Sequence, residues 1–231
     1  MNYISHIGQD RWVAETLNHK RCGFFLDFGG FDGLMHSNTF YLERFLNWRG
    51  VLVEPNPLPY SSACAVRSCI TINAALWTSS RESLKFTDSH GLSSIVDFQN
   101  NDSNTALRKQ ISNGIIEVDT INPTELLKRF SAPTLIDYMS LDVEGAELEV
   151  LTALDLDSYK IALMSIEHNH EQEKKMLIRD HLKKYSYDVI EHRNDDFFFN
   201  MDILSEITKG DFTQPLESQK NVIEKYRLVE Y

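Results

Sequence analysis

Short apolar runs alternate with amphipathic segments along most of the chain. The runs are too short for helices, are rich in β-branched and aromatic residues, and end at glycine, proline or acidic residues, which is typical of buried strands. The segments between them carry apolar residues three and four positions apart, which is typical of helices with one buried face. Such alternation predicts an α/β fold in which a mostly parallel sheet is covered by helices on both faces.

Glycine, proline and helix-capping residues set the bounds of these elements. Strands are predicted at 23–28, 50–54, 69–75, 115–118, 134–141 and 161–166, and an antiparallel hairpin at 187–191 and 197–201. Helices are predicted from Ser37 or Asn38 to near Gly50, and at 60–66, 123–130 and 171–184, with a further helix that buries Leu148, Leu151 and Leu154.

The length of 231 residues fits one domain, 1–231, because single cores rarely grow much larger. Within it we expect an N-terminal helical cap at 1–22 and a weakly patterned tail at 202–231. The polar, asparagine-rich stretch at 78–114 is predicted to be an insertion or a lid.

Composition excludes several classes of protein. The 42% hydrophobic and 25% charged residues are typical of a globular domain. A net charge of −11 repels nucleic-acid phosphates and anionic lipids, so we expect neither a nucleic-acid nor a membrane partner. Three cysteines without a disulfide framework, and a start without a signal peptide, favour the cytoplasm. Oligomeric state leaves no pattern in the sequence.

Polar residues follow each predicted strand, where ligands of open α/β sheets bind. The first strand ends in Asp27, Gly29 and Gly33. Glycines permit positive φ and bring backbone N–H groups close to a ligand, although a tight turn alone would also explain them. Because Phe31 interrupts the dinucleotide pattern G-x-G-x-x-G, a nucleoside ligand without a pyrophosphate is favoured.

The second predicted strand ends in Glu54, 54 − 27 = 27 residues after Asp27. This spacing matches one strand-helix-strand unit, and a carboxylate in this place can accept both hydroxyls of a ribose. The alternative is an exposed acid that precedes a proline.

Further acids follow the two later strands. Asp142 and Glu144 are two positions apart and are expected to face the cleft, whereas Glu147 also fits the first turn of a helix, where the helix dipole favours acids. After the next strand stand Glu167 and His168. An imidazole is suited to remove a proton from a hydroxyl near neutral pH. Two kinds of metal site stay open, a zinc pair of His168 and His170, and a hard divalent cation held by Asp142, Glu167 and Asn169.

The chain resembles the FkbM-type methyltransferases, a branch of the class I enzymes that use S-adenosylmethionine. The resemblance covers residues 4–201 and rests on the order of several motifs. They are SHIGQD (5–10), FFLDFGGFDG (24–33), SNTFYLE (37–43), WRGVLVEPNP (48–57), INAA (72–75) and SLDVEGAELEVL (140–151).

The resemblance implies a Rossmann-like, seven-stranded sheet whose last strand is antiparallel, with S-adenosylmethionine over the ends of the first two strands. It implies that Asp27, Gly29 and Gly33 surround the methionine part and Glu54 the ribose. It further implies that Asn73 and Ala74 lie at the adenine and Asp142 near the sulfonium. The resemblance finally implies that the acceptor is a hydroxyl oxygen of a sugar, glycan or other small molecule, as is usual in this family.

We therefore expect direct methyl transfer to a hydroxyl, with His168 or Glu144 as the base and Asp142 and Glu167 orienting groups or binding an ion. The N-terminal residues Gln9 and Asp10, together with His36, are expected to close the cleft. Two rival functions remain, a nicotinamide-dependent oxidoreductase acting on sugars and a cofactor-binding module without catalysis.

Overall fold

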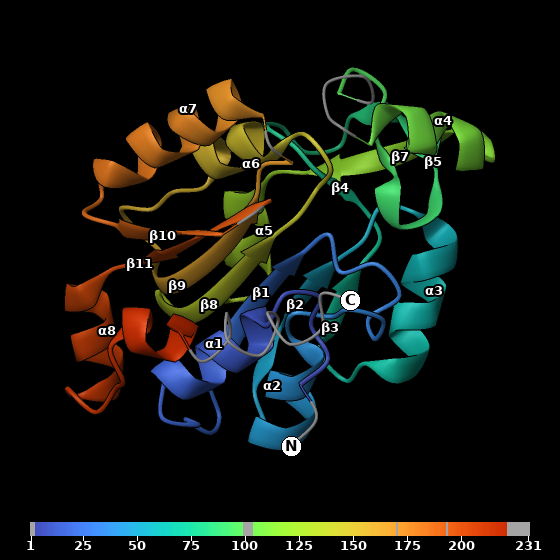
Figure 1. The fold of residues 1–231 in the computed structure, drawn as a ribbon. Helices are drawn as coiled ribbons and strands as arrows, with labels where there is room; N and C mark the ends of the chain where they lie inside the picture. The colour runs from blue at the N-terminus through green and yellow to red at the C-terminus, as the bar shows by residue number, and fades with distance from the viewer. Residues whose placement is uncertain (1–2, 99–103, 170, 193, 221–231) are drawn as a thin grey trace, which may run out of the picture.

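The computed structural model describes residues 3–98, 104–169, 171–192 and 194–220. Its centre is a sheet of seven strands in the order β10-β11-β9-β8-β1-β2-β3 (Figure 1). All neighbours pair in parallel except β11, which is antiparallel to both β9 and β10. This confirms the predicted Rossmann-like fold with its antiparallel C-terminal hairpin. The strands are β1 (Phe24–Phe28), β2 (Arg49–Val53), β3 (Ile70–Ile72), β8 (Leu135–Leu141), β9 (Lys160–Glu167), β10 (Asp188–His192) and β11 (Asp195–Phe199).

Helices cover both faces of this sheet (Figure 1). On one face lie α1 (Gln9–Thr16), α2 (Phe40–Leu46) and α8 (Met201–Thr208), and on the other α5 (Pro123–Arg129), α6 (Glu147–Ala153) and α7 (Gln172–Lys183). The helix α3 (Pro57–Val66) leads from β2 to β3. Asn56 and Asn122 cap α3 and α5, each before a proline at the first helical position, as capping preferences predict. No described helix is long and apolar enough to span a bilayer.

The third predicted strand, 69–75, is in fact two strands. β3 belongs to the large sheet, whereas β4 (Ala75–Leu76) pairs with a different strand, β7 (Gly114–Ile121). Between them, the Asn73 amide donates to the backbone oxygens of Glu54 and Pro55, both at 2.9 Å. These bonds turn the chain out of the large sheet, so the apolar run does not continue as one strand.

A second sheet, of order β4-β7-β5-β6, lies beyond the carboxyl ends of the central strands (Figure 1). It includes β5 (Ser83–Asp88) and β6 (Ser94–Ile95), which are joined through the short 3₁₀ helix η1 (His90–Leu92). The helix α4 (Thr105–Ile111) precedes β7. Most of the stretch that the sequence presented as a polar insertion is therefore ordered structure, with its own small core around Phe86, Ile95 and Val118.

The ends of the described chain pack on each other. The Trp12 indole N–H donates to the backbone oxygen of Pro215 at 3.2 Å, and the hydroxyls of Thr16 and Ser218 lie 2.6 Å apart. The segment after α8 thus covers α1, although its sequence is weakly patterned.

Candidate functional site

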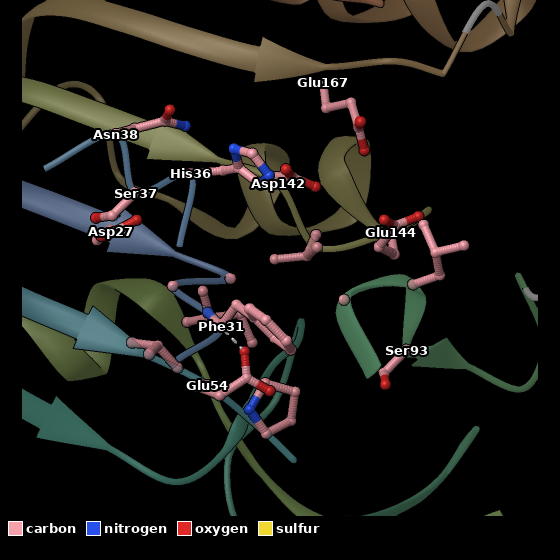
Figure 2. A pocket seen from close by; sticks show the side chains of 18 of the residues that line it. Asp27, Phe31, His36, Ser37, Asn38, Glu54, Ser93, Asp142, Glu144 and Glu167 are labelled. Carbon is pink, nitrogen blue, oxygen red and sulfur yellow. Dashed lines mark hydrogen bonds between the residues drawn. The ribbon is translucent and has the colours of Figure 1, made fainter. Parts of the chain in front are cut away.

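A cavity of about 700 Å³ opens at the carboxyl ends of β1, β2, β8 and β9 (Figure 2). The loops that follow these strands form one side of it, and η1 with its flanking strands forms the other. Its wall holds six carboxylates and, among the described lining residues, no lysine or arginine. The acids are Asp27, Glu54, Asp142, Glu144, Glu167 and Asp195.

The turn after β1 requires its first glycine. Gly29 has φ +88°, and its N–H donates to the backbone oxygen of Val53 at 3.0 Å. Gly29 and Gly30 line the cavity, whereas Gly33 does not. A Cβ on Gly33 would lie 2.8 Å from the side chain of Arg67 and 3.1 Å from Ala63, so this glycine makes room for α3 and for Arg67.

Asp27 is buried between Thr39 and Arg67. The Thr39 hydroxyl donates to its carboxylate, and the Arg67 guanidinium lies 3.5 Å away and also pairs with Glu43 at 2.5 Å. Burial raises the pKa of Asp27, and the nearby Arg67 charge opposes that rise. Asp27 lines the cavity, but its charge is already compensated by Arg67.

Glu54 follows β2 and is 6% exposed. One of its oxygens accepts from the backbone N–H of Phe31 at 3.0 Å (Figure 2), and the other accepts from the backbone N–H of Asn56 at 2.8 Å. Burial raises its pKa to about 7, and the two backbone hydrogen bonds oppose that rise. The carboxylate is therefore fixed in orientation beside the glycine turn, and each oxygen has a second lone pair for a ligand.

The two residues expected at an adenine lie apart. Ala74 is buried and lines the cavity together with Ala75 and Leu76. Asn73 is exposed and is not among the lining residues, because its amide is bound to the end of β2. Its contribution to the cavity is to shape the loop that presents Ala74.

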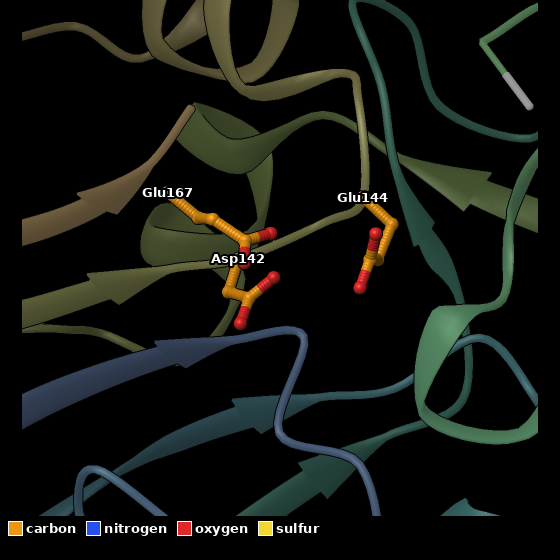
Figure 3. Close-up of side chains that lie close together, drawn as sticks. All are labelled: Asp142, Glu144 and Glu167. Atoms are coloured by element: carbon orange, nitrogen blue, oxygen red, sulfur yellow. The ribbon is translucent and has the colours of Figure 1, made fainter. Parts of the chain in front are cut away.

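Three acids meet at the ends of β8 and β9 (Figure 3). One oxygen from each of Asp142, Glu144 and Glu167 lies within 4.8 Å of the others. Burial and the neighbouring carboxylate raise the pKa of Glu167 well above its usual range, and burial raises that of Asp142 to about 6. Two adjacent buried acids disfavour a second charge, which adds to the effect of burial on both pKa values.

Glu144 and Glu147 have different surroundings despite their proximity in sequence. Glu144 has φ +54°, lines the cavity and accepts from the Arg108 guanidinium at 3.0 Å. Glu147 is fully buried and accepts from the N–H groups of Val143 and Gly145, while Lys174 pairs with its other oxygen at 2.8 Å. Glu147 therefore stabilises the loop after β8 without facing the cavity.

His168 does not reach the cavity, which removes the geometric basis for its expected role as base. Its side chain is 2% exposed, it is not among the lining residues, and its Nε2 lies 3.6 Å from the Asp196 carboxylate. Successive residues of a strand point to opposite faces, so the orientation that brings Glu167 into the cavity turns His168 away from it. The other histidine of the expected zinc pair, His170, lies outside the described residues.

The N-terminal segment closes one side of the cavity. Gln9 lines it and donates to Asp195 at 3.0 Å, and the rings of His6 and His36, both lining residues, lie 5.0 Å apart. Asp10 is fully buried and accepts from the N–H groups of Ile4 and Ser5, so it shapes this segment without facing the cavity.

Sequence reasoning did not single out three charged residues of this region. Asp195 stands opposite Glu167 in the β9 and β11 pairing, and burial raises its pKa to about 7. Arg67, which directly follows α3, binds Asp27, and Arg108, on α4, binds Glu144. Asp195 could have been inferred from the hairpin register, because an antiparallel strand begins at the edge where its neighbour ends. Neither arginine lies in a pattern that reports its partner.

Comparison with known proteins identifies the family. The sequence model of the family described as "Methyltransferase FkbM domain" matches residues 27–190. The chain belongs to the FkbM methyltransferase family. No curated protein sequence matches it. The match spans every strand end that contributes an acid to the cavity except that of β11.

Solved structures with a similar arrangement are distant. The METTL16 MTase domain is 10% identical, with a TM-score of 0.44 over 82% of this chain and 64% of that one. The human methyltransferase 10 domain containing protein is 10% identical, with a TM-score of 0.42 over 83% and 79%. The N-terminal domain of human METTL16 in complex with SAH is 11% identical, with a TM-score of 0.39 over 81% and 65%. The chain thus spans less than two thirds of the METTL16 MTase domain, and similarities this weak have no bearing on its substrate.

Proposed function

We propose that this FkbM family member is an S-adenosylmethionine-dependent methyltransferase that methylates a hydroxyl oxygen of a sugar, glycan or other small molecule. The proposal depends most on the position of Glu54. It is a buried, oriented carboxylate at the end of β2 that faces the same cavity as the glycine turn after β1. A carboxylate in this place can accept the two hydroxyls of a ribose.

The residues of the cavity fit a nucleoside that carries an amino acid. Glu54 would hold the ribose, Ala74 would contact the adenine, and the turn at Gly29 would offer the methionine part a close approach to backbone. Bound S-adenosylmethionine supplies an activated methyl group. The protein's own task is to align the acceptor oxygen and remove its proton.

The Asp142 and Glu167 pair supports a base at the sheet edge. Both carboxyls line the cavity, and the pKa of Asp142, raised by burial to about 6, suits that carboxylate to accept a proton near neutral pH. They replace His168 in that role, while Glu144, held by Arg108, would orient the acceptor. The many acids of the wall also disfavour an acceptor that carries phosphate or carboxylate groups.

A divalent cation bound to the same acids is the alternative to a proton-accepting pair. The donor set of Asp142, Glu144 and Glu167 consists of hard oxygen ligands, which suit Mg²⁺ or Ca²⁺. Asn169 adds a buried amide whose nitrogen contacts Glu167 at 2.8 Å and whose oxygen has no partner among the described residues. When bound, the ion would polarise an acceptor hydroxyl.

Calorimetry with S-adenosylhomocysteine and with NAD tests the proposal. We expect S-adenosylhomocysteine to bind wild-type protein and NAD not to bind, and the reverse result would favour the oxidoreductase. Methyl transfer from labelled S-adenosylmethionine to a panel of neutral methyl glycosides then tests catalysis. The non-catalytic module would be favoured if wild-type protein binds the cofactor but transfers its methyl group to no glycoside of a broad panel, and if Asp142→Asn binds the cofactor as wild type does.

A further inference from the structure

One guanidinium joins the two sides of the cavity. Arg108 lies on α4, within the stretch at 78–114, and its side chain is 1% exposed. Its Nε donates to the backbone oxygen of Leu92 at 2.6 Å, and its Nη2 donates to the Glu144 carboxylate at 3.0 Å. Leu92 ends η1, whereas Glu144 follows β8, so the two acceptors belong to opposite walls.

The wall held in this way faces the strand ends. His90, Gly91, Leu92 and Ser93 all line the cavity, and Figure 2 shows Ser93 on the ribbon opposite the ends of the central strands. The Ser93 hydroxyl donates to the backbone oxygen of His90 at 2.6 Å and accepts from the Ser89 N–H at 2.9 Å. The turn is therefore closed by its own hydrogen bonds.

The same helix supports that turn at further points. The backbone oxygen of Arg108 accepts from the Ser89 hydroxyl at 3.1 Å, which fixes the start of the turn to α4. Asn104, whose backbone oxygen accepts from the Arg108 N–H, is itself a lining residue. In addition, Phe98 packs on Gly145, where a Cβ would lie only 2.6 Å from the Phe98 side chain.

We propose that Arg108 is a positioning residue for methyl transfer, which sets the wall at 90–93 and the Glu144 carboxylate at a fixed separation on either side of the acceptor. This inference rests on the proposed function, and it gives the stretch at 78–114 a role in positioning the acceptor. Planar guanidinium donors hold two acceptors in fixed directions, which the single ammonium of a lysine does not. A buried carboxylate that loses its cation also tends to rearrange or to bind a proton.

The test measures backbone hydrogen exchange and cofactor affinity in Arg108→Met, Arg108→Lys and Glu144→Gln, with Lys109→Met as control. Lys109 is the neighbouring, exposed cation of the same helix. We expect exchange at 90–98 to rise about tenfold or more in Arg108→Met and Glu144→Gln, with β8 and β9 unchanged. Because both variants remove the contact between Arg108 and Glu144, the double variant should exchange no faster than the faster single one. Lysine should restore little, and the control should match wild type.

Separate outcomes overturn the proposal and the function on which it rests. If Glu144→Gln leaves exchange at 90–98 at the wild-type rate, or if the effects of the two variants add, Arg108 supports the insertion alone and the proposed coupling is wrong. With any glycoside that is methylated, Arg108→Met should raise the acceptor KM about tenfold and leave the affinity for S-adenosylhomocysteine within about threefold. Failure of wild-type protein to bind S-adenosylhomocysteine refutes the function, whereas the exchange experiment still decides the coupling.

Discussion

Gly29 lies directly against the backbone oxygen of Asp142. A Cβ on Gly29 would stand 1.7 Å from that oxygen, and the Asp142 N–H donates to the backbone oxygen of Phe28 at 2.9 Å. The turn after β1 and the first acid after β8 are therefore built against each other. A ligand over the glycine turn lies next to the acid cluster because the backbone leaves no room for a side chain between them.

Gly29→Ala tests this contact. The added methyl group meets main-chain atoms, which cannot rotate away, and the residue also has a positive φ. We expect a loss of more than about 3 kcal/mol in the free energy of unfolding, measured in urea, and loss of S-adenosylhomocysteine binding. Gly210→Ala is the control, since Gly210 has φ +83° with no atom within 4 Å of a Cβ. It should cost about 1 kcal/mol, and equal costs at the two sites would contradict the packing argument.

Glu54→Gln tests the proposed ribose contact. The amide keeps the size of the side chain but replaces one acceptor oxygen with a donor, which opposes either the Phe31 or the Asn56 N–H. We expect the affinity for S-adenosylhomocysteine to fall by about tenfold or more, measured by calorimetry. Glu117→Gln, on the exposed face of β7, should leave the affinity unchanged. A wild-type affinity in Glu54→Gln would place the ribose elsewhere.

The raised pKa values of Glu54 and Asp195, both about 7, predict how stability depends on pH. Between the pKa of an unfolded acid, about 4, and pH 7, the folded protein binds more protons than the unfolded chain, so stability falls as pH rises. At a pH above both pKa values, this pH-dependent loss of stability is complete. We expect urea midpoints of the ligand-free protein to decrease from about pH 5 to about pH 8. Glu54→Gln should flatten this slope, and an unchanged slope would contradict the raised pKa of Glu54.

Much of this architecture could be predicted because its signals are local. The apolar runs of β1, β2, β8 and β9 end within about one residue of the predicted bounds, and each strand end delivers its acid to one edge of the sheet. Parallel strands make that convergence unavoidable, which is why Glu54 and Asp142 could be named without a structure.

Other features depend on contacts between distant segments. The strands β5 and β6 are short and largely polar, and β5 pairs with β7 on one side and with β6 on the other. His168 has the right chemistry for a base, but the pleat at Glu167 decides which of the two faces the cavity. Arg67 and Arg108 lie 67 − 27 = 40 and 144 − 108 = 36 residues from the acids they pair with, and no spacing rule covers such distances.

Arg67→Met tests the support beneath the glycine turn. The side chain of Arg67 is fully buried and pairs with Asp27 and Glu43, so its loss leaves two acids without their cation. We expect the free energy of unfolding to fall by about 3 to 5 kcal/mol, because the uncompensated charges remain buried. The comparison is Arg129→Met, an exposed arginine near the end of α5 that should change stability by less than about 0.5 kcal/mol. A small effect at Arg67 would mean that the two acids are solvated or protonated in the folded protein.

The acid cluster makes opposite predictions with and without a divalent ion. If Asp142, Glu144 and Glu167 hold Mg²⁺ or Mn²⁺, these ions should raise the thermal midpoint of the wild-type protein, and Mn²⁺ should give a bound signal in electron paramagnetic resonance. Asp142→Asn and Glu167→Gln should each abolish both effects, while Glu117→Gln should keep them. If the pair instead shares only a proton, added ions should leave the thermal midpoint unchanged, and chelator-treated protein should keep its methyl transfer. Glu167→Gln should then raise the thermal midpoint, because it removes the repulsion between the two buried acids. The response of the wild-type thermal midpoint to added ions therefore separates the two arrangements independently of the acceptor.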